Sequence, residues 1–429
     1  MSDADQERFE RAVVNLAGAP SPEQQPARRS HPMLAALRRA GTTHVYADSA
    51  DVDEVGTLVR AEDFVWEEVD GSTANQPLVG KVFARYLEAA DVGAWADALR
   101  AVRPRLDERD LVAHLYAVLC SQTARDVIAA YAAGRDWGAS VQLHMSLMHD
   151  PSTAVRVGHM IRAMVPTAVV KVPFTPHAPA CLWVARELER AGIPVNFTST
   201  FSARQTVIAA LLADVSLTNI FMGRINQGLE ATLLGEHVDL AAQRALRALR
   251  RDHGAKTLLI VASVREWETF VHTAGCDVYT APCAAIAGFM QQNEHAPETI
   301  VDQVERSYLD AMTIGAAVES GIGRARIARL YEVEPELIEF LLEWRETREA
   351  RAMTDGDALA RRFEEAGFGD VFYAPTAAEW QQLRASKLPV LGAELTTRLA
   401  LDTLYTLLAD ADFDKYQEAM DTDLLTRLG

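Results

Sequence analysis

The chain has 429 residues, of which 49% are hydrophobic and 24% charged, a composition typical of a globular protein and not of a disordered or fibrous one. Its formal net charge of −18 argues against a nucleic-acid partner, because phosphate backbones are bound by clustered Lys and Arg. The N-terminus lacks a signal-peptide pattern, and no apolar run reaches the length of a membrane span. The sequence therefore predicts a cytoplasmic protein without a membrane partner.

Residues 1–40 are polar and contain a proline-rich stretch, so we expect them to form a loosely packed N-terminal leader. From Gly41 onward, short β-rich runs alternate with stretches whose apolar residues recur at helical spacing. The expected strands are THVYAD, DFVWEEVDG, ASVQLHM, AVVKVPF, PVNFTST, LTNIFMG, TLLIVAS and CDVYTAP. Strands that alternate with helices imply parallel βαβ units, and eight of them favour a closed (β/α)₈ TIM barrel over residues 41–295. An open doubly wound sheet is the alternative.

Two regions interrupt the alternation. After the second expected strand, residues 82–137 have a helical pattern throughout, which predicts a helical insertion. Residues 296–429 are also mostly helical in pattern and predict a C-terminal extension. The fold class predicted from the sequence is thus an α/β TIM barrel with these two helical additions.

Reactive groups of such barrels lie at the carboxyl ends of the strands, and this rule selects candidates before any family is considered. In chain order they are Asp48, Asp70 with the loop STANQPL, Gln142, His144, Lys171, Asn196, Thr198, Asn219, Arg224, Ser263 and Arg265. No metal or other cofactor is expected. The four cysteines lack metal-ligand spacing and are interpreted as small buried apolar residues, and His144 and His177 as structural or peripheral.

Lys171 is one of only five lysines among 42 basic residues, and it lies in the apolar run Val-Val-Lys-Val-Pro. Loss of hydration lowers the pKa of an ammonium group and favours the neutral amine, which can attack a ketone. The iminium that forms is an electron sink for breaking the adjacent C–C bond. A strand-end lysine that pairs with a carboxylate or extends to solvent explains the local sequence equally well.

Asp48 follows an apolar strand, where a carboxylate can act as a general base or can simply cap the next helix, with Ser49 beside it. Arg224, Ser263 and Arg265 follow two neighbouring strands. Two guanidinium groups and a hydroxyl at the same rim would form an oxyanion clamp suited to phosphate. Surface salt bridges are the alternative interpretation of these arginines.

These segments together resemble the transaldolase family of class I Schiff-base aldolases over about residues 43–282. The motifs that carry the resemblance are YADSADVDEV, DGSTANQPL, VVKVPFT, GIPVNFTSTFSARQ, NIFMGRI and VASVRE, six segments in the family's order, each at a strand end. The resemblance implies that Lys171 is the Schiff-base lysine and that Asp48 is the acid/base group near the substrate's C4 hydroxyl. The other implied roles are hydrogen bonding to substrate or lysine by Asn75 and Asn196, positioning of a catalytic water by Thr198, and phosphate binding by Arg224, Ser263 and Arg265.

The sequence also departs from the family pattern. Gln142 occupies the position of a glutamate that moves protons through a water, and an amide cannot ionise. The fructose-6-phosphate aldolase branch resembles this chain in having Gln there, but it usually has a Tyr at the position of Phe221. Asn219 replaces a usual Ser, and His144 replaces a usual Asp. We predict a catalytic role for Gln142 with Lys171, Asp48 and Thr198, and substrate-binding roles for Asn219 and Phe221.

The resemblance implies a transferase of carbohydrate metabolism, of the pentose phosphate type. It would transfer or cleave a three-carbon dihydroxyacetone unit of a phosphosugar ketose, with phosphorylated ketoses and aldoses as partners and a homo-oligomeric state. Alternatives are a fructose-6-phosphate-aldolase-like or specialised biosynthetic aldolase, and a catalytically reduced phosphosugar-binding barrel. A barrel isomerase or epimerase that uses Asp48 as its base is a further alternative, although it would leave Lys171 without a purpose.

Overall fold

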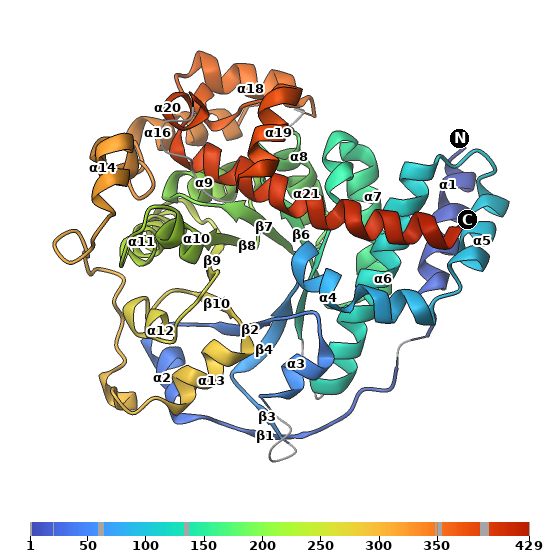
Figure 1. Cartoon of the computed structure of the whole chain (residues 1–429), viewed down its shortest axis with the longest axis horizontal. Coiled ribbons are helices and arrows are strands. Elements are labelled where there is room, and N and C mark those ends of the chain that lie inside the picture. Colours follow the sequence, from blue (N-terminus) through green and yellow to red (C-terminus); the bar gives the residue numbers. More distant parts are fainter. Residues whose placement is uncertain are drawn as a thin grey trace.

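The computed structural model describes residues 2–428 except 20, 59–63, 133–136, 348–349, 351–353 and 387–393. Eight parallel strands form a closed barrel in the order β10-β2-β4-β5-β6-β7-β8-β9 (Figure 1). Their bounds are β2 His44–Asp48, β4 Val69–Thr73, β5 Gly138–Gln142, β6 Ala168–Pro173, β7 Val195–Thr200, β8 Leu217–Phe221, β9 Leu258–Ala262 and β10 Val278–Ala281. The structure confirms the TIM barrel predicted from the sequence and excludes the open sheet.

The composition of the strands explains why they lie inside. All six residues of β6, which reads Ala-Val-Val-Lys-Val-Pro, are buried, as are all six residues of β7. Continuous runs rich in β-branched residues are typical of parallel strands that are covered on both faces. Helices follow the strands around the barrel: α3 Val52–Gly56, α7 Pro151–Met164, α8 Cys181–Arg190, α9 Ala203–Ile208 with a π-helical turn Ala209–Ala213, α10 Met222–Gly228, α11 Leu234–His253, α12 Glu268–His272 and α13 Cys283–Gln291.

The second expected strand corresponds to two separate strands in the structure. The segment DFVWEEVDG divides into β3 (Phe64–Trp66), which pairs with β1 (Ala27–Arg29) outside the barrel, and β4, which belongs to the barrel. Asp70 is therefore the second residue of β4 and not a residue of its carboxyl end. Its carboxylate binds His44 at 2.8 Å and Arg38 at 3.0 Å, and it does not join the candidate residues at the rim.

Helices occupy the insertion and both terminal regions. The insertion comprises α4 Gln76–Ala89, α5 Val92–Val102 and α6 Glu108–Tyr131. Within residues 1–40, α1 (Asp3–Leu16) buries Phe9 and Val13 completely, and α2 (Pro32–Ala40) packs near α13. The C-terminal region comprises α14 Ala316–Ile322, α15 Arg324–Ala328, α16 Pro335–Arg345, α18 Gly356–Glu365, α19 Ala377–Ala385, α20 Glu394–Arg398 and α21 Leu401–Leu428. The division into leader, barrel and extension stays a prediction.

Helix α21 crosses the barrel face at which the strands end. In Figure 1 it runs from the C-terminal helices past the barrel toward α5. It contacts β7, the 3₁₀ turn Met145–His149 after β5, and helices α4 and α6. The last helix of the chain thus closes part of the barrel mouth.

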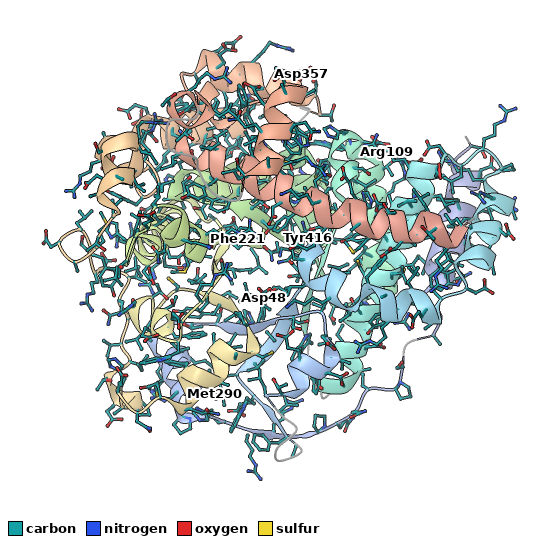
Figure 2. The ribbon with its side chains drawn as sticks, viewed as in Figure 1. Asp48, Arg109, Phe221, Met290, Asp357 and Tyr416 are labelled. Atoms are coloured by element: carbon teal, nitrogen blue, oxygen red, sulfur yellow. The ribbon has the colours of Figure 1, made fainter. Side chains whose placement is uncertain are left out.

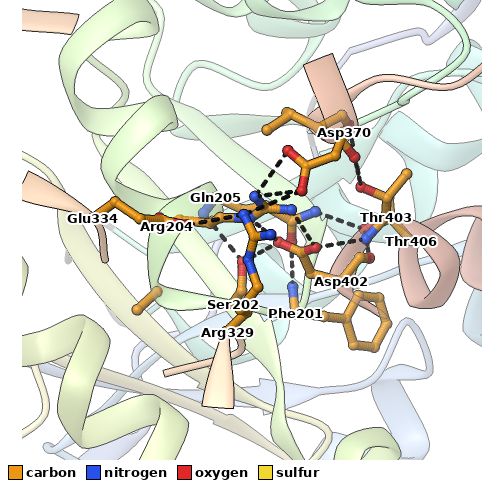
Figure 3. Close-up of polar contacts among 12 residues, drawn as sticks. Phe201, Ser202, Arg204, Gln205, Arg329, Glu334, Asp370, Asp402, Thr403 and Thr406 are labelled. Atoms are coloured by element: carbon orange, nitrogen blue, oxygen red, sulfur yellow. Dashed lines mark hydrogen bonds and ion pairs between the residues drawn. The ribbon is translucent and has the colours of Figure 1, made fainter. Parts of the chain in front are cut away.

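Buried polar contacts hold α21 at both ends. The Arg204 guanidinium is completely buried and makes two bonds to Asp402 of α21, at 2.7 and 2.8 Å, and two to Asp370, both at 3.1 Å (Figure 3). Near the other end, His144 Nε2 lies 3.0 Å from a carboxylate oxygen of Asp421. His144 thus joins the loop after β5 to α21, and its structural or peripheral role stays a prediction.

All four cysteines are buried free thiols, as predicted. Within the part of the chain that the structure describes, no helix is long and apolar enough to cross a membrane. Among the same residues, no group of three or more His, Cys, Asp or Glu side chains is placed to hold a metal ion.

Candidate active site

Lys171 lies near the carboxyl end of β6, in register with Gln142 on β5 and Asn196 on β7. Its side chain is only 3% exposed, and Nζ donates a hydrogen bond to the carbonyl oxygen of Ala74 at 3.3 Å. Burial lowers the pKa of Lys171 to about 8, against the opposing effect of the Asp48 charge. The barrel thus places an amine that is easily deprotonated near neutral pH among the inward-pointing side chains.

Asp48, the last residue of β2, is the carboxylate that acts on Lys171 electrostatically. Its Oδ1 accepts a hydrogen bond from Thr73 Oγ1 at 2.7 Å, and Thr73 also contacts Thr280. Burial raises the pKa of Asp48, whereas Lys171 and the bond from Thr73 lower it. Helix α3 is capped instead by Asp51, whose carboxylate accepts from the Asp53 amide at 3.0 Å. The helix-capping alternative for Asp48 is therefore wrong.

A cavity of about 260 Å³ opens at this end of the barrel and contains most of the predicted residues. Figure 2 places Asp48 and Phe221 around the barrel opening, beside α21 with Tyr416. The predicted residues that line the cavity are Asp48, Asn75, Lys171, Asn196, Asn219, Phe221, Arg224, Ser263 and Arg265. Side chains from six barrel strands or the loops after them thus converge on one space, as expected for the functional end of a TIM barrel.

Gln142 and Thr198 are buried in the barrel but do not border the cavity. Gln142 Oε1, Thr198 Oγ1, Asn196 Oδ1 and both amide atoms of Asn219 are buried without a hydrogen-bond partner. Buried polar atoms normally have a partner, so a cluster without partners marks a place where water or substrate completes the bonding. Asn75 also caps α4, because its Oδ1 accepts from the Leu78 amide at 3.1 Å.

Arg224, Ser263 and Arg265 lie near one another in the wall of the cavity. Ser263 has a backbone φ of +62°, which turns the chain sharply directly after β9. A Cβ atom on Gly223 would lie 2.1 Å from the Ser263 carbonyl oxygen, so only glycine fits there. This close approach of α10 and the segment after β9 brings Arg224 and Arg265 to one rim, which supports the predicted clamp.

Further residues that line the cavity were not selected from the sequence, among them Glu54, Lys81, Thr280 and Phe413. Thr280 lies in the last barrel strand, and the strand-end rule could have found it. Glu54 and Lys81 belong to α3 and α4, and the Glu54 carboxylate accepts from Ser49 Oγ at 2.7 Å. Phe413 comes from α21, and no local signal in the sequence connects it with the barrel.

A larger cavity of about 810 Å³ lies next to the site, between α10, α11 and α12. It shares Arg265 with the smaller cavity but contains neither Lys171 nor Asp48. The smaller cavity holds the buried amine of Lys171 and the partly buried carboxylate of Asp48.

These features define the class: a TIM-barrel protein with a buried lysine and a partly buried aspartate at the carboxyl ends of its strands. The sequence profile described as transaldolase/fructose-6-phosphate aldolase matches residues 45–324, from β2 to the beginning of α15. This match covers well over half of the chain, and the chain belongs to this family. Most of the C-terminal helical region, including α21, lies outside the matched residues.

Curated relatives carry the name probable transaldolase. One from Rhodospirillum centenum is 33% identical over 247 residues, which cover 56% of this chain and 81% of the relative. One from Aquifex aeolicus is 32% identical over 135 residues, 31% of this chain and 57% of the relative. One from Thermus thermophilus is 29% identical over 182 residues, 42% of this chain and 63% of the relative. The chain thus spans about three fifths of the length of the last two relatives.

Proposed function

We propose that this chain transfers or cleaves a three-carbon dihydroxyacetone unit of a phosphosugar ketose through an imine on Lys171. The observation that carries the proposal is a buried lysine, with its pKa lowered to about 8, in a cavity that also holds the partly buried carboxylate of Asp48. Membership of the transaldolase/fructose-6-phosphate aldolase family supports the same chemistry.

The neutral amine of Lys171 attacks the ketone carbon, and the carbinolamine loses water to form an iminium ion. Asp48 then removes the proton of the C4 hydroxyl. The C3–C4 bond breaks, its electron pair moves toward the iminium nitrogen, and the shortened aldehyde leaves. The enamine that remains on Lys171 either attacks an acceptor aldehyde, which is transfer, or takes a proton and is hydrolysed, which is cleavage.

Few side chains at the site can transfer protons during imine formation and hydrolysis. Gln142 has an amide and cannot ionise, so Gln142 and Thr198 contribute by holding a water through hydrogen bonds. Asp48 and Glu54 are the carboxylates among the described residues that line the cavity. We therefore propose that Asp48 serves as the principal acid and base of the whole cycle.

The test is mass spectrometry with peptide mapping after incubation with fructose 6-phosphate and borohydride, which reduces an imine to a stable secondary amine. We expect an adduct on Lys171 in the wild type and none in Lys171→Met. Lys81→Met is the matched control, because Lys81 lines the same cavity and its loss should leave the adduct in place. An adduct confined to Lys81, or no adduct although binding of the sugar is confirmed separately, would contradict the proposal.

Transfer and cleavage are distinguished by the fate of the enamine. Turnover of fructose 6-phosphate that requires added erythrose 4-phosphate would indicate transfer, and turnover without an acceptor would indicate aldol cleavage. The amide of Gln142 cannot deliver a proton, so hydrolysis of the enamine should be slow, and this supports transfer.

The second candidate function is a phosphosugar-binding barrel without catalysis, and Gln142 is the observation that favours it. Binding of fructose 6-phosphate to Lys171→Met with unchanged affinity, together with absence of an imine in the wild type, would support this alternative. A buried Lys171 with a lowered pKa beside the Asp48 carboxylate argues against it, because binding alone requires neither.

A further inference from the structure

The C-terminal helix contributes directly to the rim of the active site at Arg224. The Arg224 Nη2 atom lies 3.2 Å from Asp412 Oδ2 of α21. The guanidinium also lies over the ring of Phe221, at 5.7 Å, and over the ring of Phe413, at 5.3 Å. Arg224, which the family resemblance associates with the substrate phosphate, is thus held by two residues of α21.

The pairing with Asp412 changes the charge that a substrate meets at this rim. A free guanidinium attracts a phosphate dianion, but a guanidinium paired with a carboxylate is nearly neutral, and Asp412 itself repels a second anion. The pairing costs a hydroxyl group much less binding free energy than it costs a phosphate, since a hydroxyl can hydrogen-bond to either Arg224 or Asp412. Arg265 has no ion-pair partner among the residues that the structure describes, so one full positive charge remains at this rim for an anion.

Two other ion pairs also dock α21 on the barrel. The Arg204–Asp402 pair anchors one end of the helix, with Arg204 completely buried, and the His144–Asp421 pair anchors the other. The Arg224–Asp412 pair lies between these anchors and keeps partial exposure, with 26% and 32% of the two side chains accessible. Its position indicates a role toward the cavity rather than toward the stability of the helix.

We propose that Asp412 is a specificity-determining residue that lowers the preference of this site for phosphorylated over unphosphorylated sugars. The proposal rests on the proposed function, which assigns the substrate phosphate to the Arg224 side of the cavity. It extends that function by naming the substrate class: the site accepts ketoses that end in a free hydroxyl as well as in a phosphate.

The first test measures binding of inorganic phosphate by calorimetry, which requires no turnover. Asp412→Asn removes the negative charge and keeps the shape, and we expect it to bind phosphate about tenfold more tightly than the wild type. Asp412→Glu restores the charge and should behave like the wild type. Asp423→Asn is the matched control, because Asp423 lies on the same helix, is exposed, and loses the same charge. It should leave the affinity unchanged.

A double-variant cycle assigns the effect to Arg224. In an Arg224→Leu background, Asp412→Asn should no longer change phosphate affinity. The second test compares kcat/KM for fructose 6-phosphate with that for fructose. Asp412→Asn should raise this ratio about tenfold, through a lower KM for the phosphorylated sugar.

The proposal is overturned if Asp412→Asn binds phosphate no more tightly than Asp423→Asn, or if it binds more weakly, which would mean that Asp412 orients Arg224 for phosphate. It is also overturned if neither the wild type nor Asp412→Asn binds phosphate. These outcomes are independent of imine trapping on Lys171, so failure of the proposed function and failure of this inference are distinguishable.

Discussion

The lowered pKa of Lys171 predicts how its reactivity depends on pH. A shift from 10.5 to about 8 corresponds to about 3 kcal/mol of differential stabilisation of the neutral amine. At pH 7 the neutral fraction is then about one tenth, compared with about three in ten thousand for an unshifted lysine. Burial produces the shift and Asp48 opposes it, so Asp48→Asn should lower the pKa of Lys171 further.

The assay is trace labelling with acetic anhydride over a range of pH, with the Lys171 peptide quantified by mass spectrometry. The unprotonated amine is the reactive form, so labelling should rise with pH through a midpoint near 8. Asp48→Asn should move that midpoint to lower pH, and the same peptide in denatured protein provides the unshifted reference. A midpoint near that of the denatured chain, or a rise in the midpoint for Asp48→Asn, would refute this account of the site's electrostatics.

Two further predictions concern the anchoring of α21 and the amide in the barrel. Asp402→Ala leaves the buried Arg204 without its bidentate partner, although Asp370 still contacts it, and should lower the free energy of unfolding by about 3 kcal/mol in urea denaturation. The exposed Asp423→Ala should change it by less than about 0.5 kcal/mol, and an equal effect of both variants would contradict the anchoring role. Gln142→Glu introduces an ionisable group beside Lys171 and should raise steady-state turnover of fructose 6-phosphate. Unchanged turnover would indicate that Asp48 alone moves the protons.

The barrel and most of the candidate site could be predicted from the sequence because both depend on local pattern. Runs such as Val-Val-Lys-Val-Pro are readable as buried parallel strands, and the alternation with helices implies the topology. Residues at the carboxyl ends of such strands meet at one rim whatever the details of packing. That rule is sufficient to bring Asp48, Lys171, Arg224 and Arg265 to one cavity.

Local pattern did not locate the boundary within the second expected strand. The segment DFVWEEVDG has strand-forming residues on both sides of its two glutamates, but Phe64–Trp66 pairs with Ala27–Arg29 and only Val69–Thr73 enters the barrel. The strand with which a β-rich segment pairs depends on which other segment lies beside it in the folded protein. Strand propensity carries no information about that partner.

The sequence by itself determined the barrel, its family and the residues at the strand ends, because these follow from periodicity and from motifs within single segments. The tertiary structure alone decided that α21 crosses the barrel mouth, that Phe413 lines the cavity, and that Asp412 pairs with Arg224. The Arg224–Asp412 pair joins residues 188 positions apart. The physical reason is that a helix's own pattern shows which residues it buries but not which surface covers them, and here that surface is the rim of the active site.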